Sequence, residues 1–271
     1  MHFTIMARPV LRDTLFLLGL LICIAGVRTV EVDDEEQFSY IKGDSRGPEH
    51  WGDLVDEWAI CGNGRQQSPI ALVKSQAVIS PDLGELQRIY HPGKAILENR
   101  GHDIRVRWPR GGGSLVINGR NYILKQTRWH SPAEHSVDGI IYPLEFQMEH
   151  QTEDNSSAVV SMLYSYGKPN TFLTKVVAKL PLISDKEPPK EPLGLVDPFE
   201  IIVPDKEYYR YSGSLSTPIC REGVIWSVLE KISTASEEQV KALQNAIHDE
   251  YKLNARPVQP TNGRIVKIYI P

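Results

Sequence analysis

The sequence predicts a mostly β, single-domain protein of α+β character, and three observations support this fold class. Apolar and polar residues alternate strictly over 103–108. The apolar runs 115–117 and 122–124 flank an Asn118-Gly119 turn, as the two arms of a β-hairpin do. One segment, from Ser236, has a convincing helical pattern, and the 20 glycines and 19 prolines among 271 residues favour many turns.

Strand patterns continue along the rest of the chain. Further strands are predicted at 142–148, 158–164, 174–180 and 263–270. Gly111 to Gly113 precede a strand pattern and not a helix, so they cannot place a helix N-terminus beneath a phosphate. The segment 185–192 is interpreted as a surface loop of the same domain, because strand patterns lie on both sides of it.

The helix predicted from Ser236 has a defined start. Ser236 and Gln239 form a Ser-x-x-Gln capping box, in which each side chain satisfies a backbone N–H at the helix N-terminus. Val240, Leu243 and Ile247 then recur at helical spacing. These signals predict one amphipathic helix.

The N-terminal residues 1–30 are predicted to be a cleaved signal peptide. Arg8 and Arg12 precede an apolar stretch from Leu15 to Gly26, which has signal-peptide length and is too short to span a bilayer comfortably. The cleavage site is indistinct, which leaves an uncleaved anchor as the alternative. Cleavage would leave residues 31–271 as one secreted domain with a sizeable core.

The charge balance excludes one class of partner. The formal net charge is -4, from 30 Lys+Arg and 34 Asp+Glu, and no Lys/Arg-rich block appears. Nucleic acid is therefore not an expected partner. No segment after the signal peptide is apolar enough to span a membrane, and the oligomeric state is left open.

Cysteine usage and a glycosylation sequence agree with export. Cys23 lies in the signal stretch, which leaves Cys61 and Cys220 either as one disulfide in an oxidising compartment or as two free buried thiols. Asn155-Ser156-Ser157 is an N-glycosylation sequence in a polar turn between apolar runs. We expect a glycan at Asn155.

Polar side chains concentrate between residues 126 and 150, where chemistry is expected. If 126–130 is a strand, Arg128 and His130 point to one face. If 142–149 is another, Glu145, Gln147 and Glu149 share a face while the apolar residues between them enter the core. The two polar faces then meet in a cleft. The alternative is that both faces are solvated and His130 is a surface histidine.

Six segments in order along the chain resemble the α-class carbonic anhydrases. They are GPEHWG (47–52), QSPI (67–70), NRGH (99–102), WHSPAEH (129–135), LE (144–145) and SLSTP (214–218). Together with the Cys61/Cys220 pair, they look most like the secreted plant branch, the nectarin-like and dioscorin-like proteins. The resemblance covers nearly all of 31–271, and it implies a large, twisted, mainly antiparallel sheet with short peripheral helices.

The resemblance also implies a zinc site, and here the sequence departs from the family. Family members hold zinc with three histidines and keep a fourth position for hydroxide. The three corresponding positions are Arg128, His130 and Gln147, so His130 is the one retained ligand. A guanidinium stays protonated at ordinary pH and opposes a metal cation. Zinc is therefore expected of the family but is predicted not to bind here.

The other active-site positions of the family are largely kept. His102 matches the proton-shuttle histidine, with a surface histidine as the alternative, and Glu145 matches the acid that supports the third histidine. The Gln147 amide can still donate to Glu145. The remaining matches are the hydroxide-orienting positions Tyr40, Glu134, Ser216 and Thr217 and the apolar CO2-pocket positions Val159 and Trp226. Glu149 replaces an apolar wall residue, and a carboxylate there opposes a nonpolar gas.

These departures lead to a hypothesis for the site. Arg128 is predicted to occupy the place of the metal, with its charge compensated by Glu149 or Glu134, because an unpaired buried guanidinium is costly. The pocket would then hold a small anion such as bicarbonate. The predicted function is that of a secreted, zinc-free protein with a binding or storage role.

Two other functions stay open on the sequence. One is CO2 hydration at a reorganised, weak zinc site that uses His130 with Glu149 and Gln147. The other is an ascorbate-linked redox activity, as ascribed to some plant relatives. Cys61 and Cys220 would offer that chemistry no free thiol if they form a disulfide.

Overall fold

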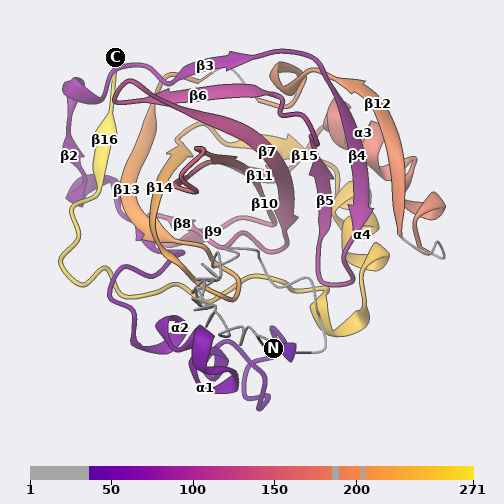
Figure 1. The fold of residues 1–271 in the computed structure, drawn as a ribbon, viewed down its shortest axis with the longest axis horizontal. Coiled ribbons are helices and arrows are strands. Elements are labelled where there is room, and N and C mark those ends of the chain that lie inside the picture. The colour runs from indigo at the N-terminus through magenta and orange to yellow at the C-terminus, as the bar shows by residue number, and fades with distance from the viewer. Residues whose placement is uncertain (1–36, 185–188, 203–204) are drawn as a thin grey trace, which may run out of the picture. The chain divides into compact units, whose positions relative to one another are not determined.

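Strands dominate the described part of the chain and form one large and one small sheet (Figure 1). The computed structural model describes residues 37–184, 189–202 and 205–271, so the predicted signal peptide, residues 1–30, lies outside the described residues. The strands are β1 (Ala71–Leu72), β2 (Val78–Ile79), β3 (Gln87–Tyr90), β4 (Gly93–Asn99), β5 (Ile104–Arg107), β6 (Gly113–Ile117), β7 (Arg120–His130), β8 (Ser136–Val137), β9 (Ile140–Ile141), β10 (Leu144–Gln151), β11 (Ser157–Tyr166), β12 (Lys190–Val196), β13 (Tyr208–Ser214), β14 (Glu222–Leu229), β15 (Ser233–Ala235) and β16 (Lys267–Tyr269).

Strand pairing is mainly antiparallel. The large sheet has the order β12-β4-β5-β7-β10-β11-β14-β13-β16-β2, with β6 joining β7, β3 joining β6, and β15 joining β11. The small sheet has the order β1-β8-β9. Among the described strands, β11 pairs in parallel with β14 and β15, β16 with β2, and β1 with β8. The predicted mostly β fold, with a large and mainly antiparallel sheet, is confirmed.

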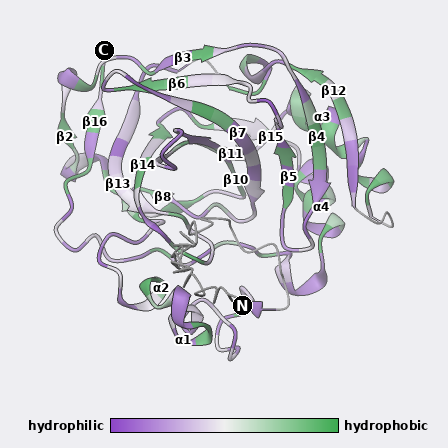
Figure 2. Ribbon diagram, viewed as in Figure 1, coloured by the Kyte–Doolittle hydropathy of each residue, from purple (hydrophilic) through white to green (hydrophobic). Residues whose placement is uncertain are grey.

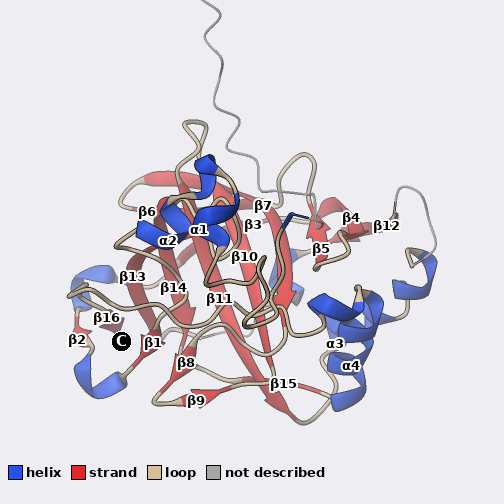
Figure 3. Cartoon of the chain, turned by 90° about the horizontal axis from the view of Figure 1, so that it is seen from below, coloured by secondary structure: helices blue, strands red, loops and turns tan. Residues whose placement is uncertain are grey.

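The helices are short and lie at the margins of the sheet (Figure 3). They are α1 (Trp51–Leu54), α2 (Ile60–Asn63), α3 (Thr171–Val177) and α4 (Glu237–Ala246), with the 3₁₀ helices η2 (Asp56–Trp58), η3 (Lys74–Gln76), η4 (Pro81–Leu83), η5 (Leu180–Leu182), η6 (Pro198–Glu200) and η7 (Asp249–Tyr251). The predicted capping box of α4 is present, with Ser236 and Gln239 each bonding the other's backbone N–H. No helix in the described ranges has the length and apolar character needed to cross a membrane.

The strand predicted at 174–180 is wrong, because this segment is mostly the helix α3. Asn170 caps it, its side chain accepting a hydrogen bond of 2.9 Å from the Leu173 N–H. Phe172, Leu173 and Val176 are buried, at spacings that one helix face can share. The β-branched residues of the segment favour a strand in isolation, but burial of that face outweighs their local preference.

Other element boundaries differ from the predicted ones by a few residues. The loop predicted at 185–192 is wrong at its end, since β12 begins at Lys190 and pairs with β4 through Pro192. Residues 185–188 lie outside the described residues. Pro192 is tolerated within β12 because β12 is an edge strand of the sheet. Of the strand predicted at 263–270, residues 267–269 are paired as β16.

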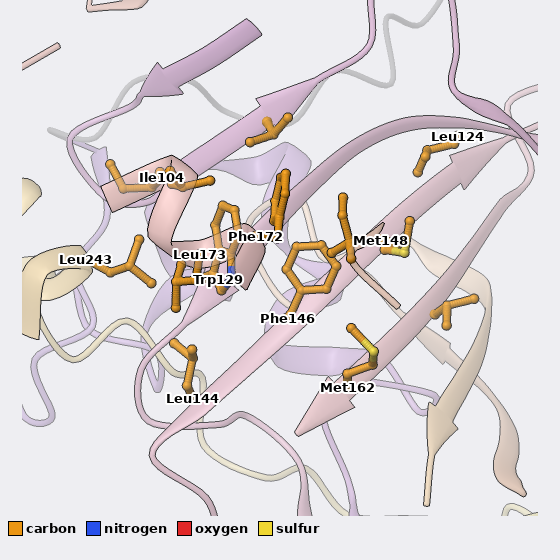
Figure 4. Packing of buried hydrophobic residues seen from close by; sticks show 14 of the residues in the cluster. Ile104, Leu124, Trp129, Leu144, Phe146, Met148, Met162, Phe172, Leu173 and Leu243 are labelled. Carbon is orange, nitrogen blue, oxygen red and sulfur yellow. The ribbon is translucent and has the colours of Figure 1, made fainter. Parts of the chain in front are cut away.

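The two faces of the large sheet bury different side chains. Hydrophobic and hydrophilic residues alternate along β5, as Figure 2 shows. On one face, Trp129 and Phe146 pack with their ring centroids 5.1 Å apart, beside Phe172 and Leu173 of α3 and Leu243 of α4 (Figure 4). The opposite face carries the polar residues of β7 and β10, whose positions are therefore fixed by this core.

A disulfide joins two segments that are far apart in the sequence. Cys61 in α2 bonds Cys220, which lies just before β14, across a sequence separation of 159. This observation decides between the two readings of the cysteines, one disulfide or two free thiols. It ties the N-terminal helical segment to the loop that carries Ser216 and Thr217.

The buried His150 predicts an acid-dependent loss of stability. Its Nε2 lies 2.8 Å from the Tyr90 hydroxyl and its Nδ1 lies 3.2 Å from the Ala158 carbonyl oxygen. Burial lowers the pKa of His150 to about 4, although the hydrogen bonds with backbone groups of Ala158 and Met148 oppose the shift. The unfolded chain binds this proton near the usual pKa of about 6.5, so stability is full above that pH and falls towards pH 4.

We expect His150 to contribute about 3 kcal/mol to that loss. Denaturant unfolding measured between pH 7 and pH 4 checks it, with His150→Gln losing this part of the pH dependence. His91→Gln, at an exposed histidine, is the matched control. An unchanged pH dependence in His150→Gln would contradict the assignment.

Candidate functional site

The polar residues predicted on β7 and β10 lie side by side on one face of the sheet. Arg128 is paired in register with Gln147, and His130 with Glu145. All of these side chains are buried, with Arg128 4%, Gln147 3% and His130 0% exposed. The alternative that these faces are simply solvated is therefore wrong. Burial makes every charge in this cluster depend on a partner.

Arg128 forms a buried ion pair with Glu149. Its Nη2 lies 2.8 Å from Glu149 Oε2. The Gln126 side-chain amide donates to the same oxygen at 2.6 Å. The expectation that Arg128 finds a carboxylate is confirmed for Glu149, and the pair adds no net charge to the sheet face.

The Gln147 amide links two carboxylates. Its Nε2 donates to Glu134 Oε2 at 2.7 Å and to Glu145 Oε1 at 3.0 Å. An amide NH2 has two hydrogens, so both are used. The predicted bond from Gln147 to Glu145 is present, and Glu134 is an additional partner.

Glu145 is the best-supported carboxylate of the site. Its Oε1 accepts from Ser161 Oγ at 2.7 Å and pairs with His135 Nδ1 at 2.8 Å. Its Oε2 accepts from the backbone N–H groups of Glu134 and His135 at 2.9 and 2.8 Å. Burial alone would raise the pKa of Glu145, but the His135 ring and these hydrogen bonds outweigh it and hold the pKa below its usual range.

His130 keeps one ring nitrogen occupied and the other without a partner. Its Nδ1 lies 2.8 Å from the Asn254 carbonyl oxygen, which can only accept, so Nδ1 carries the hydrogen. Nε2 is buried and has no hydrogen-bond partner among the described residues. With the hydrogen on Nδ1, Nε2 is the ring nitrogen that can carry a lone pair.

The residues around His130 do not fit a catalytic zinc ion. Such an ion requires three nitrogen, oxygen or sulfur ligands in tetrahedral geometry. In the described ranges, no three His, Cys, Asp or Glu side chains are grouped so that they could hold a metal ion. Arg128 and Gln147 both present N–H groups to carboxylates, where a metal needs lone pairs.

His102 and Tyr40 lie in an aromatic cluster near the site. The His102 ring lies 5.3 Å from that of Phe38 and 6.1 Å from that of Tyr251. The surface-histidine alternative is wrong, since His102 is 1% exposed. Burial raises the pKa of Tyr40, and the negative charges of Glu134 and Asp103 raise it further. Tyr40 therefore stays protonated.

Ser216 and Thr217 are buried next to the disulfide, but the Ser216 hydroxyl does not form the predicted pair with the Glu134 carboxylate. Ser216 makes no hydrogen bond to Glu134 within the described residues. Glu134 instead accepts from Gln147 and, through Oε1, from the Arg256 backbone N–H at 3.1 Å. The carboxylate and hydroxyl predicted to orient a hydroxide are thus not bonded to each other.

Val159 and Trp226 form the apolar side of the same face. Register places Glu149 opposite Val159, and Val159 opposite Trp226. Both apolar residues belong to a second buried cluster on this face. The Glu149 carboxylate lies at the edge of that cluster and turns to Arg128.

Sequence reasoning missed several supporting residues. His135 connects Glu145 to Tyr211, whose hydroxyl lies 2.7 Å from His135 Nε2. Asn254 and Arg256 come from an irregular segment near the C-terminus, and Arg256 is buried with its guanidinium donating to Gln67 Oε1 at 2.8 Å. No periodic pattern marks 252–262, so nothing in the local sequence signals these contacts.

Comparison with known proteins places these observations in a family. The family model described as eukaryotic-type carbonic anhydrase matches residues 46–270. "Alpha carbonic anhydrase 7" of Arabidopsis thaliana is 46% identical over 241 residues, 89% of this chain and 88% of that protein. "Carbonic anhydrase Nec1" of Nesocodon mauritianus is 40% identical over 260 residues, 94% of each chain. The crystal structure of dioscorin complexed with ascorbate superposes with a TM-score of 0.83 at 41% identity, covering 85% of this chain and 97% of that one.

The ion pair predicts a strong coupling between Arg128 and Glu149. Glu149→Val should destabilise the protein by about 3–5 kcal/mol, because it leaves the buried guanidinium without its carboxylate. Arg128→Met/Glu149→Val should cost much less than the sum of the two single changes. Denaturant unfolding of all three variants measures this, with Glu153→Gln at an exposed position as control. Additive effects would show that the pair is not coupled.

Proposed function

This chain belongs to the eukaryotic-type carbonic anhydrase family, and we propose that it is a secreted, zinc-free member with a binding or storage role. The observation that carries the proposal is the pairing at the ligand positions. Arg128 is held by Glu149, and Gln147 is held by Glu134 and Glu145. The Arg128 guanidinium and the Gln147 amide are thus bonded to carboxylates of the same cluster.

CO2 hydration in this family requires a metal to generate hydroxide. Without a bound metal ion, the pKa of water stays far above neutral instead of falling to about 7, so hydroxide is scarce at neutral pH. His130 offers a single imidazole lone pair, and Glu149, the carboxylate that could join it, is committed to Arg128. Catalysis at a reorganised zinc site would require breaking that buried ion pair.

The ligand class that fits the site is a small anion, with bicarbonate as the simplest example. Arg128 supplies a permanent positive charge. Since Glu149 already neutralises it, an anion has to replace the Glu149 oxygen at the guanidinium. The crystal structure of dioscorin with ascorbate supports this class, because a relative of 41% identity accepts a small acidic molecule.

Ascorbate-linked redox activity is the second candidate, favoured by that same complex. The Cys61–Cys220 disulfide removes both of these thiols as reductants in the folded protein. Any such activity would then rest on ascorbate itself as the reductant. We rank it below simple binding for this reason.

Export is part of the proposal. Residues 1–30 would be the cleaved signal peptide, and 31–271 the secreted domain. Asn155, the proposed glycan site, is exposed in the turn between β10 and β11. The disulfide agrees with an oxidising compartment.

Placing histidines at positions 128 and 147 should produce zinc binding. We expect the purified native chain, after dialysis against zinc, to hold no stoichiometric zinc and to show no CO2 hydration. Arg128→His/Gln147→His/Glu149→Val should gain both, because three imidazoles then converge and the unpaired carboxylate is removed. Elemental analysis and a hydration assay on the same samples check this.

The matched controls for this experiment are Arg128→His/Glu149→Val and Gln147→His, which remain one imidazole short. They should hold less zinc than the full reversion. Stoichiometric zinc with hydration activity in the native chain would overturn the proposal.

Substitutions at Glu149 and at Arg128 should change the affinity for anions in opposite directions. Glu149→Gln keeps a hydrogen-bonding side chain but removes the competing charge, so it should tighten ascorbate and bicarbonate binding by about tenfold. Arg128→Gln should abolish it. Titration calorimetry measures both ligands, and equal affinities in the native chain and both variants would exclude this site.

A further inference from the structure

A cavity lies on the other face of the large sheet from the candidate site. It has a volume of about 590 Å³, and its lining residues come from β3, β6, β13, β14 and β16 and the segments next to them. Arg210 on β13 lines it. Tyr211, the next residue of β13, also borders the cavity, but its side chain bonds His135 of the candidate site, so alternation along the strand directs the Arg210 and Tyr211 side chains to opposite faces.

Arg210 is a mostly buried cation without an acidic partner. Its Nε donates to Ser227 Oγ at 3.1 Å, and its guanidinium stacks 5.1 Å from the centre of the Tyr208 ring. Among the described residues, its other guanidinium nitrogens have no hydrogen-bond partner and no carboxylate pairs with it. Burial lowers the pKa of Arg210, although Tyr208 and Tyr122 oppose this, and the group stays protonated at ordinary pH.

The acidic residues of the cavity are already paired. Asp82 lies 3.5 Å from Lys267 Nζ, and Glu85 lies 2.7 Å from Lys206 Nζ. Neither is therefore the counter-ion of Arg210. The positive charge of Arg210 is the one charge of the cavity lining that no described side chain offsets.

The rest of the lining mixes apolar and polar side chains. Leu86, Ile117, Ile225 and Ile265 line the cavity together with Tyr208, and Gln87, Asn118 and Ser212 lie among them. Apolar surface beside a few polar groups is found in small-molecule sites, and the volume lies in their usual range. A buried arginine prefers a carboxylate that can accept two parallel hydrogen bonds.

We infer that this cavity is a binding site for a small carboxylate with an aromatic or branched apolar body. The carboxylate bonds the free edge of the Arg210 guanidinium, and the apolar body lies against Tyr208, Ile225 and Ile265. The site is separate from Arg128 and His130 and does not depend on the proposed function. Its selectivity comes from one fixed cation beside the apolar side chains of Tyr208, Ile225 and Ile265.

The test uses 1-naphthoate as the probe and 1-naphthamide as its neutral match, measured by fluorescence titration of the full secreted chain. The native protein should bind 1-naphthoate at least about tenfold more tightly than 1-naphthamide. Arg210→Gln should weaken 1-naphthoate by a similar factor and leave 1-naphthamide unchanged. Arg210→Lys should retain part of the affinity, since the charge stays but the planar fork is lost.

A second variant keeps the test independent of folding. Ile265 lines the cavity and is 65% exposed, so Ile265→Glu adds a repelling charge without disturbing the core. It should weaken 1-naphthoate binding, whereas saturating ascorbate should not displace the probe. Equal binding of the two probes, no effect of either substitution, displacement by ascorbate, or no binding at millimolar 1-naphthoate would each overturn the inference.

Discussion

The Glu145 carboxylate, buried near the start of β10, is the contact on which the rest of the candidate site depends. It accepts from two successive backbone N–H groups in the loop after β7, from Ser161 on β11 and from Gln147 on its own strand, and it pairs with His135. One side chain thus holds the loop after β7, the neighbouring strand β11 and the Gln147 amide. Burial would favour the neutral acid, and these donors reverse that preference.

Around this carboxylate, the face of the sheet is organised by local neutralisation of charge. Arg128 bonds Glu149, and Gln147 bonds both Glu134 and Glu145, in a water-poor environment. Histidines that hold a metal need the opposite arrangement, with lone pairs left over. Arg128 and Gln147 instead direct N–H groups at carboxylates of the same cluster.

The two faces of one sheet carry different chemistry because side chains alternate along each strand. On β13, Tyr211 belongs to the network of Glu145, while its neighbour Arg210 lines a cavity on the opposite face. The polar network fills the first face with paired groups. Among the described residues of the second face, Arg210 has no carboxylate paired with it.

The sequence by itself determined the strand-rich fold, the capping box at Ser236 and, through resemblance to a family, the expectation that Arg128, His130 and Gln147 belong to one site. These are carried by local periodicity and by ordered motifs, which the chain displays without folding. Only the tertiary structure decided that Arg128 pairs with Glu149 and that Glu134 turns from Ser216 to Gln147. It also decided that Asn254 holds His130 and that α3 replaces a predicted strand. The physical reason is that a buried polar group takes the partner that packing brings within about 3 Å, and that choice is made across the sheet, between residues far apart in the chain.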